Sequence, residues 1–338
     1  MEPSLTPNEE FLVTVNDPNS SQDSAEQHVL AVSETVLATT SMSQEELPGS
    51  LVFYLLIMFC NTSLITVIAM NKNLYEPMYI FVCNLCLNGL CGSTAIFPKL
   101  MADIISEAKV ISQAECLIQM LFEIIFSTNE LSLLTVMAYD RYVSICNPLR
   151  YVSLVTKRKI CTLLILPWLY SFCFAISLIF QVFRLPLCSK FIADISCNFQ
   201  AYIKLSCTDV SVSNMYETSI SIIHAFTLMA VIVYSYVQIF KVCYRASKRA
   251  KSKALNTCMT HFLLLFVHLF AGLLGFYQVR TGGGTVDFVH FFVSLSFFMT
   301  PPLFNPLIYG IRTQEIRKTI QKVITNRTLC PFLRIKKG

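Results

Sequence analysis

The stretch from Cys116 to Tyr139 reads CLIQMLFEIIFSTNELSLLTVMAY, and its 24 residues include only two charged side chains, Glu123 and Glu130. A helix needs roughly 20 mostly apolar residues to cross about 30 Å of hydrocarbon. This stretch is long enough, and the charged pair Asp140-Arg141 follows it at once. It therefore predicts a membrane-spanning helix that ends at a polar surface.

Six other stretches of similar length and composition lie before and after it: Leu51–Met70, Met78–Leu100, Ile160–Phe183, Ser219–Val242, His261–Val279 and Val289–Tyr309. The chain is 54% hydrophobic and only 14% charged, whereas soluble domains are about 25% charged. Backbone groups in lipid must be satisfied within the segment, so these continuous runs predict helices and not a β-barrel. The predicted fold class is an all-α membrane protein, a seven-transmembrane helix bundle. Pro301, Pro302 and Pro306 are expected to interrupt the last helix.

The distribution of basic residues predicts the orientation. With the N-terminus outside, the inner segments 71–77, 140–159, 241–253 and the tail after 311 hold 20 of the 26 Lys and Arg residues. This bias follows the positive-inside rule. We therefore expect a multi-pass plasma-membrane protein with an extracellular N-terminus and a cytoplasmic C-terminus. The net charge of +5 then reflects orientation and not nucleic-acid binding.

The two ends of the chain differ from the apolar middle. Residues 1–48 hold nine acidic residues and no Lys or Arg, which predicts a disordered extracellular segment without the features of a secretory signal. The seven-helix domain is expected at 49–311, and a cytoplasmic tail with a short amphipathic helix at 312–338. Asn19 begins an outward glycosylation sequon. Cys330 is either palmitoylated or an ordinary free thiol.

Four of the fourteen cysteines lie on the predicted outer side. Cys116 begins the third span, and Cys188, Cys197 and Cys207 share the loop after the fourth. An even number of cysteines in an oxidising compartment predicts two disulfides. One of them must join the loop to the third span, but the residue spacing does not show which cysteine does so.

One face of the third span links its outer half to its inner end. Glu123, Ser127 and Glu130 are spaced i, i+4 and i+7, and the same steps lead to Arg141, about 27 Å along the axis. Acids at membrane depth are costly to bury, so the default interpretation of Glu123 and Glu130 is that they have a function. Glu123 is either a ligand contact or a packed structural group, and Glu130 is either a switch or a protonated structural group.

Asp140-Arg141-Tyr142 follows the span. An adjacent acid can hold the arginine in an exposed pair worth about 0–1 kcal/mol, which predicts a latch that opens to free the guanidinium for a partner.

A series of longer motifs resembles odorant receptors of the rhodopsin-like, G-protein-coupled class. Residues 137–151, MAYDRYVSICNPLRY, are similar to the family's MAYDRYVAICxPLxY. The other motifs follow in order: LYEPMY at 74–79, PKLM at 98–101, ELSLL at 130–134, SY at 235–236, KALNTCMTH at 253–261 and PLFNPLIY at 302–309. The resemblance covers about 51–325. It implies the disulfides Cys116–Cys197 and Cys188–Cys207.

Several positions depart from the family pattern. The aspartate expected in the second span is Gly89, so Glu130 should lack its usual partner, with Asn88 and Ser132 as partial substitutes. Sodium modulation is therefore in doubt. The aromatic motif of the sixth span is replaced by His268-Leu269-Phe270. Asn88-Gly89-Leu90 is similar to fish odorant receptors, which implies a water-borne ligand.

The resemblance implies an odorant receptor that binds a small molecule within the bundle and activates a stimulatory, olfactory-type G protein to raise cyclic AMP. The implied switch residues are Asp140, Arg141, Tyr142, Glu130, Tyr236, His261, Asn305, Pro306 and Tyr309. Phase and depth give the ligand candidates as Glu123, Ile124, Ser127, Thr128, Ile220, His224, Leu273, Phe276, Phe291, Phe292 and Leu295. Glu123 suggests a ligand with a cationic or hydrogen-bond-donating group.

The sequence shows no arrangement of catalytic or metal-binding residues, so we expect neither an enzyme nor a cofactor. One alternative is a non-olfactory receptor of the same fold for an amine, peptide or lipid. A transporter is another, but it would need polar groups spread over several spans and an internal repeat, and the sequence shows neither.

Overall fold

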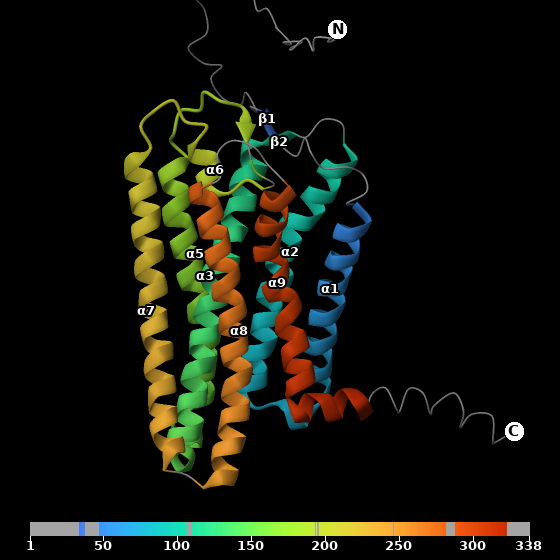
Figure 1. Cartoon of the computed structure of the whole chain (residues 1–338), viewed down its shortest axis with the longest axis vertical. Helices are drawn as coiled ribbons and strands as arrows, with labels where there is room; N and C mark the ends of the chain where they lie inside the picture. The colour runs from blue at the N-terminus through green and yellow to red at the C-terminus, as the bar shows by residue number, and fades with distance from the viewer. Residues whose placement is uncertain are drawn as a thin grey trace, which may run out of the picture. The chain divides into compact units, whose positions relative to one another are not determined.

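The computed structural model describes residues 34–37, 47–106, 110–192, 194, 196–245, 247–281 and 288–322; side chains at 34–37, 191, 248–257, 276–281 and 288–294 are outside this description. Its long helices have 24 to 34 residues and run up and down beside one another (Figure 1). They are α1 (Leu47–Met70), α2 (Pro77–Ile105), α3 (Gln113–Cys146), α5 (Lys157–Val182), α7 (Ser211–Tyr244), α8 (Lys248–Thr281) and α9 (Phe288–Arg312). The seven predicted spans are thus confirmed as seven long helices.

Six of these helices are long and apolar enough to cross a membrane within the described residues, and α9 falls outside that group. The described part of α9 carries Pro301, Pro302, Asn305 and Pro306, residues that lower its mean hydropathy. The outward faces are apolar: Phe59 of α1 is 69% exposed and Phe226 of α7 is 73% exposed. Such surfaces fit contact with lipid.

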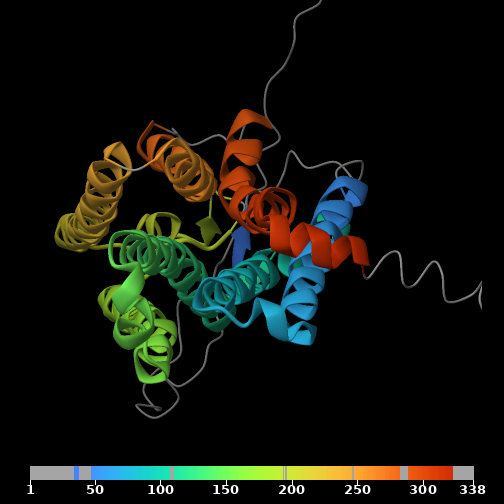
Figure 2. The same ribbon diagram turned by 90° about the horizontal axis from the view of Figure 1, so that it is seen from below.

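Helix α3 is the central helix of the bundle. In its most apolar window 72% of the residues are buried, against 17% for α7. It contacts α2, α5, α7 and α8, as the view along the bundle shows (Figure 2). Ser112 and Glu115 form a capping box that begins α3: the Ser112 side chain accepts from the Glu115 N–H, and the Glu115 carboxylate accepts from the Ser112 N–H.

Helix α9 continues through its prolines, so the predicted interruption is wrong. Pro306 has no N–H to donate to the Pro302 carbonyl four residues earlier. Asn61 of α1 replaces it, because its Nδ2 donates to the Pro302 carbonyl at 2.8 Å. A neighbouring helix therefore satisfies the group that proline frees, as lipid requires. Gly89 of α2 allows this close approach: a Cβ there would lie 3.1 Å from Pro302 Cβ.

At the end of the bundle that carries the disulfides, called here the disulfide end, short strands form a three-stranded sheet of order β2-β1-β3. Strand β1 (Glu34–Leu37) pairs antiparallel with β2 (Val110–Ser112) and parallel with β3 (Phe191–Ile192). The one-turn helix α6 (Phe199–Ile203) follows in the same loop. Strand β1 falls within 1–48, so four residues of the segment predicted to be disordered form a strand. Their sequence ETVL includes two β-branched residues, which favour strands.

The opposite end, called the Arg141 end, is closed by short helical turns: η2 (Lys72–Leu74), η3 (Pro148–Arg150) and α4 (Tyr151–Leu154). Residues 314–322 form one more helix after Thr313, which turns across the end of the bundle (Figure 1). Ile316 is fully buried against the core, while Glu315 and Lys318 are exposed. The predicted short amphipathic helix is therefore present.

Candidate functional site

A cavity of about 250 Å³ opens beside Glu123 near the disulfide end. It is lined by α3, α7, α8, α9 and the loop between α5 and α7. The lining residues are Glu123, Ile124, Ser127, Asp194, Ser196, Asn198, Phe199, Gln200, Glu217, Gly272, Gly275, Phe297 and Phe298. Three of them are acids, and none of these described lining residues is Lys, Arg or His.

Glu123 is the most enclosed acid of this cavity, with 6% of its surface exposed. It is hydrogen-bonded to Ser196 and lies near Asp194. Its Oε1 atom is buried without a hydrogen-bond partner among the described residues. Unsatisfied buried acceptors are costly, so this atom is ready for a donor that enters the cavity.

The other two acids have polar neighbours. Asn198 donates to the Asp194 carboxylate at 2.7 Å. Gln200 donates to Glu217 at 2.9 Å and also to Asn214. These contacts tie the loop to the first turns of α7, so the loop forms one wall of the cavity.

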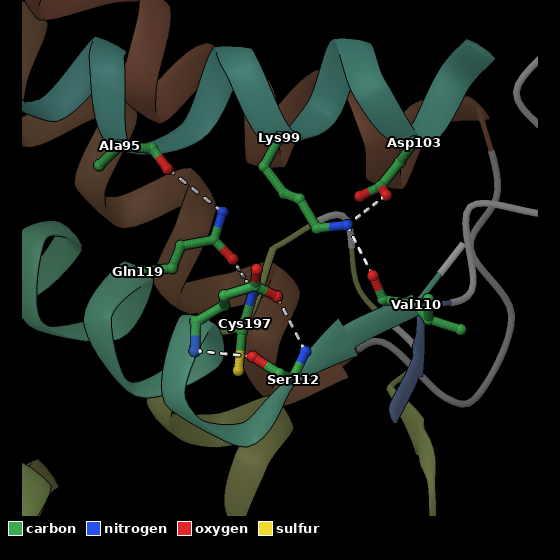
Figure 3. Close-up of polar contacts among 8 residues, drawn as sticks. Ala95, Lys99, Asp103, Val110, Ser112, Gln119 and Cys197 are labelled. Carbon is green, nitrogen blue, oxygen red and sulfur yellow. Dashed lines mark hydrogen bonds and ion pairs between the residues drawn. The ribbon is translucent and has the colours of Figure 1, made fainter. Parts of the chain in front are cut away.

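Two disulfides hold that loop over the bundle: Cys116–Cys197 and Cys188–Cys207, each with Cα atoms 5.2 Å apart. The pairing implied by the family resemblance is confirmed. Gln119 adds a polar tie, accepting from the Cys197 N–H at 2.9 Å and donating to the Ala95 carbonyl of α2 (Figure 3). The loop is thus fixed to α3 at the level just above Glu123.

The ends of α2 and α3 are joined next to this tie. Lys99 forms an ion pair with Asp103 one turn further along α2 and donates to the Val110 carbonyl of β2 (Figure 3). The contact holds β2 against α2 and so positions the start of α3.

Glu130 lies two turns below Glu123 and is fully buried. Its carboxylate accepts from Asn88 of α2 at 2.9 Å and from Asn305 of α9 at 2.6 Å. Asn129 in turn donates to Asn88. Glu130 thus lacks the family's acidic partner at position 89, and the expected substitution by Asn88 is present, whereas the one by Ser132 is not. Asn88 and Asn305 supply the donors, whereas Ser132 donates to the Thr128 carbonyl of its own helix.

At the Arg141 end, Arg141 and Asp140 form an ion pair with N···O at 2.5 Å, and Tyr151 of α4 donates to the other Asp140 oxygen at 2.7 Å. The side chains are 16% and 1% exposed, so the expected exposed pair is mostly buried. Removing one partner of a buried pair costs about 3–5 kcal/mol, which is more than the cost of breaking an exposed pair at the surface. Burial and the bond to Asp140 both raise the pKa of Tyr151, which keeps its hydroxyl a donor.

Helices α8 and α9 are linked one turn above this pair. Tyr309 and His261 are joined by a hydrogen bond of 3.3 Å between the Tyr309 hydroxyl and His261 Nδ1. Tyr236 of α7 lies in the adjoining core clusters, and Tyr142 contacts Tyr234 with ring centroids 6.1 Å apart. The predicted switch residues of α3, α7, α8 and α9 thus gather along the half of the bundle that ends at Arg141.

A family model described as olfactory receptor matches residues 50–327. The chain belongs to the olfactory receptor family. Human olfactory receptor 4E1 is 36% identical over 276 residues, which cover 81% of this chain and 86% of the relative. Mouse olfactory receptor 4E2 is 35% identical over 282 residues, 82% of this chain and 89% of the relative. Human olfactory receptor 4N5 is 31% identical over 309 residues, 90% of this chain and 99% of the relative.

This olfactory receptor is therefore an odorant-sensing, G-protein-coupled receptor of the plasma membrane, a multi-pass signalling protein and not an enzyme. Receptors of this family bind odorants and couple to G proteins. The family match removes the transporter alternative and favours an odorant over the other ligand classes considered for the fold.

The structure brings three of the predicted ligand residues of this receptor to the cavity: Glu123, Ile124 and Ser127. Others lie elsewhere. Leu273 is 68% exposed on the outside of α8, and Leu295 is buried against α1 and α2. His224 faces α5, where it contacts Tyr170. The sequence did not predict this, because the phase of a helix does not show which neighbouring helix its buried face meets.

Two other predicted positions, Thr128 and Ile220, are not among the described lining residues. Thr128 bonds to the Ile124 carbonyl of its own helix, and Ile220 packs against the cluster beneath the loop. The side chains of Phe276, Phe291 and Phe292 are outside the described residues, as are Asn19 and Cys330 entirely. Predictions at those positions stay predictions.

The prediction missed the loop residues Asp194 and Ser196, and Glu217 of α7. Helix phase gives no information on a loop, so Asp194 and Ser196 left no signal. Glu217 could have been predicted from the sequence, because it lies seven residues before His224 and so shares its helix face. An acid so near a membrane span is also a candidate ligand-binding residue in its own right.

Proposed function

We propose that this receptor binds a small-molecule odorant with a cationic or hydrogen-bond-donating group in the cavity beside Glu123, and that binding activates a stimulatory G protein of the olfactory type, which raises cyclic AMP. The disulfide end faces the outside and the Arg141 end faces the cytosol. The bias of Lys and Arg towards segments of the Arg141 end supports this orientation.

The observation that carries the ligand class is Oε1 of Glu123, which is buried without a partner among the described residues in a cavity with two more acids, Asp194 and Glu217. An ammonium group is the complement of such a site, since it donates several charge-assisted hydrogen bonds and offsets the burial of carboxylates. A neutral donor such as an amide would serve Glu123 alone. An anionic ligand would meet like charge.

The route from this cavity to the G protein follows α3. Glu123, Glu130 and Arg141 stand at successive levels of one helix, and Glu130 joins α3 to α2 and α9 through Asn88 and Asn305. A ligand that shifts Glu123 therefore acts on a helix that four others contact. It can change the balance of states only by its differential affinity for them.

Helix α8 is the element that moves in this proposal. Among the described residues it contacts α9 extensively but touches α7 little, so it can swing away from α7 at small cost. The Tyr309–His261 bond is one contact that such a swing would break. The movement would open a pocket beside Arg141.

Replacing Glu123 with Gln tests the ligand class, because Gln keeps the shape and removes the charge. We expect the concentration for half-maximal cyclic AMP response to the best amine to rise at least about tenfold, the value of one charge-assisted hydrogen bond. Glu115→Gln is the matched control, since Gln also completes a capping box. The agonist would come from a screen of water-soluble amines, amino acids, bile-type and nucleotide compounds. A response unchanged in Glu123→Gln would sink the cationic-ligand proposal.

Replacing Arg141 with Ala tests the coupling step. We expect the cyclic AMP response to be lost while antibody staining of an N-terminal epitope on intact cells persists. Arg150→Ala is the control, because Arg150 is an exposed basic residue at the same end. Signalling at the wild-type level in Arg141→Ala would contradict the assigned role.

A further inference from the structure

A second cavity, of about 340 Å³, lies between α5 and α7 with α3 as its floor. Its lining residues are Ser132, Thr135, Val136, Leu163, Leu166, Pro167, Tyr170, Ile223, His224, Thr227 and Leu228. It shares no residue with the Glu123 cavity. Both α5 and α7 pack closely on α3 but contact each other little, which leaves the crevice between them.

The crevice opens towards lipid. Ile223 on its α7 side is 64% exposed and Leu166 on its α5 side is 56% exposed, and both belong to membrane-spanning helices. Tyr170 is the middle of the 26 residues of α5. The polar part of the crevice therefore lies at the depth of the hydrocarbon, where there is no water to bond it.

His224 is the polar group that this environment leaves incomplete. It is 8% exposed, its Nδ1 is 2.9 Å from the Tyr170 hydroxyl, and the two rings stack with centroids 5.4 Å apart. Its Nε2 is buried without a hydrogen-bond partner among the described residues. Pro167 adds to this, because it has no N–H for the carbonyl of Leu163, which also lines the crevice.

We propose that this crevice is a binding site for a small, uncharged, mostly hydrocarbon alcohol that enters from the lipid and bonds its hydroxyl to His224. The hydroxyl is the fitting group because the tautomer of a neutral histidine decides whether Nε2 donates or accepts, and a hydroxyl does both. Most of the other lining residues are aliphatic, and the hydroxyls of Ser132 and Thr135 donate to backbone carbonyls of their own helix. An apolar cavity of about 150 Å³ holds a benzene ring, so this one takes a longer ligand.

The depth of His224 argues against a sterol of the bilayer as the occupant. A sterol keeps its hydroxyl at the water-facing level, whereas this site offers its polar atoms in the middle of the helix. The proposed ligand also differs from that of the Glu123 cavity, which is acidic and lined in part by the loop between α5 and α7. The inference is therefore independent of the proposed function.

The test uses the purified full-length receptor in lipid nanodiscs and a photoreactive ten-carbon alcohol that carries a diazirine. We expect covalent labelling of residues 163–170 and 223–228, reduced by excess 1-decanol and not by decane or cholesterol. In His224→Phe, which keeps the ring, 1-decanol should compete about fivefold less well, the net value of one hydrogen bond. Equal competition by decane, or by cholesterol, would overturn the proposal.

A second pair of variants keeps the test valid if His224→Phe does not fold. Ile223→Trp fills the mouth of the crevice from a lipid-exposed position and should abolish the labelling. Val233→Trp is its control, since Val233 is 54% exposed on the same helix but does not line the crevice. Labelling that survives Ile223→Trp would show that the alcohol binds elsewhere, and the inference would fail.

Discussion

Glu130 shows how one substitution in the family pattern is accommodated by its neighbours. Glycine at position 89 removes the acid of α2 that the resemblance pairs with Glu130. The structure places two amide donors, Asn88 and Asn305, on its two oxygens instead. A carboxylate with donors on both oxygens has its buried acceptors satisfied, so the site is complete from side chains alone.

Gly89 is explained by packing. A Cβ at this position would lie 3.1 Å from Pro302 Cβ and 3.3 Å from Pro302 Cα. The two helices meet there closely enough that any Cβ would force Pro302 to shift by a few tenths of an ångström. The missing aspartate and the close contact of α2 with α9 are therefore one feature.

We predict that Gly89→Ala lowers the thermal unfolding temperature of the purified receptor by several degrees, because overpacking a rigid contact costs about 1–3 kcal/mol. A fluorescence-detected thermal unfolding assay in detergent would measure it. Gly49→Ala is the control, since nothing lies within 4 Å of a Cβ there. Equal unfolding temperatures for the two variants would contradict the packing argument.

The sequence predicts the residues of α3 better than those around it. Periodicity placed Glu123, Glu130 and Arg141 on one inward face because a helix repeats every 3.6 residues, and two of them are buried in the structure. It misplaced Leu273 and His224, since the buried face of a peripheral helix depends on neighbours that the pattern does not name. It missed Asp194 because disulfides and loop contacts, not periodicity, bring that residue to the cavity.

At the scale of elements, α9 shows why the predicted interruption of this helix at its prolines was wrong. The sequence treats each proline as a break, because proline removes a backbone donor. What it cannot show is a donor from a helix 241 residues away: Asn61 Nδ2 bonds the Pro302 carbonyl. Within the bilayer such outside donors make a proline-containing helix tolerable.

We predict that Asn61→Ala destabilises the receptor by about 1–3 kcal/mol, because the Pro302 carbonyl is left without a donor. In the double variant Asn61→Ala/Pro306→Ala the new N–H of residue 306 can bond that carbonyl, so part of the loss should be recovered. A double-mutant cycle of unfolding free energies measures the coupling. Pro301→Ala paired with Asn61→Ala is the control. Strict additivity in the Pro306 cycle would refute the assignment.

At the scale of the whole molecule, the receptor has two differently built halves. Near the disulfide end, two disulfides, the Gln119 tie and the β-sheet fix the loop to α3. At the Arg141 end, α8 is joined to α9 by the Tyr309–His261 bond and contacts α7 little. Under the proposed function, a ligand that binds in the fixed half changes the arrangement of helices in the looser half.

Three helices bring a cysteine each to one small core cluster at the looser end: Cys146 of α3, Cys243 of α7 and Cys258 of α8. If α8 swings away from α7 on activation, a short covalent link between Cys243 and Cys258 must prevent it. We predict that a short, membrane-permeant bismaleimide, which adds one cysteine thiol to each of its two rings, abolishes the cyclic AMP response of receptors that remain at the cell surface. The response should persist in Cys258→Ser, which cannot form the link, and in wild type treated with a maleimide that carries a single reactive ring. Mass spectrometry of the linked peptides would confirm the bond.

Full signalling by a receptor shown to be linked would mean that α8 and α7 stay together, and the activating motion would have to lie elsewhere in the bundle.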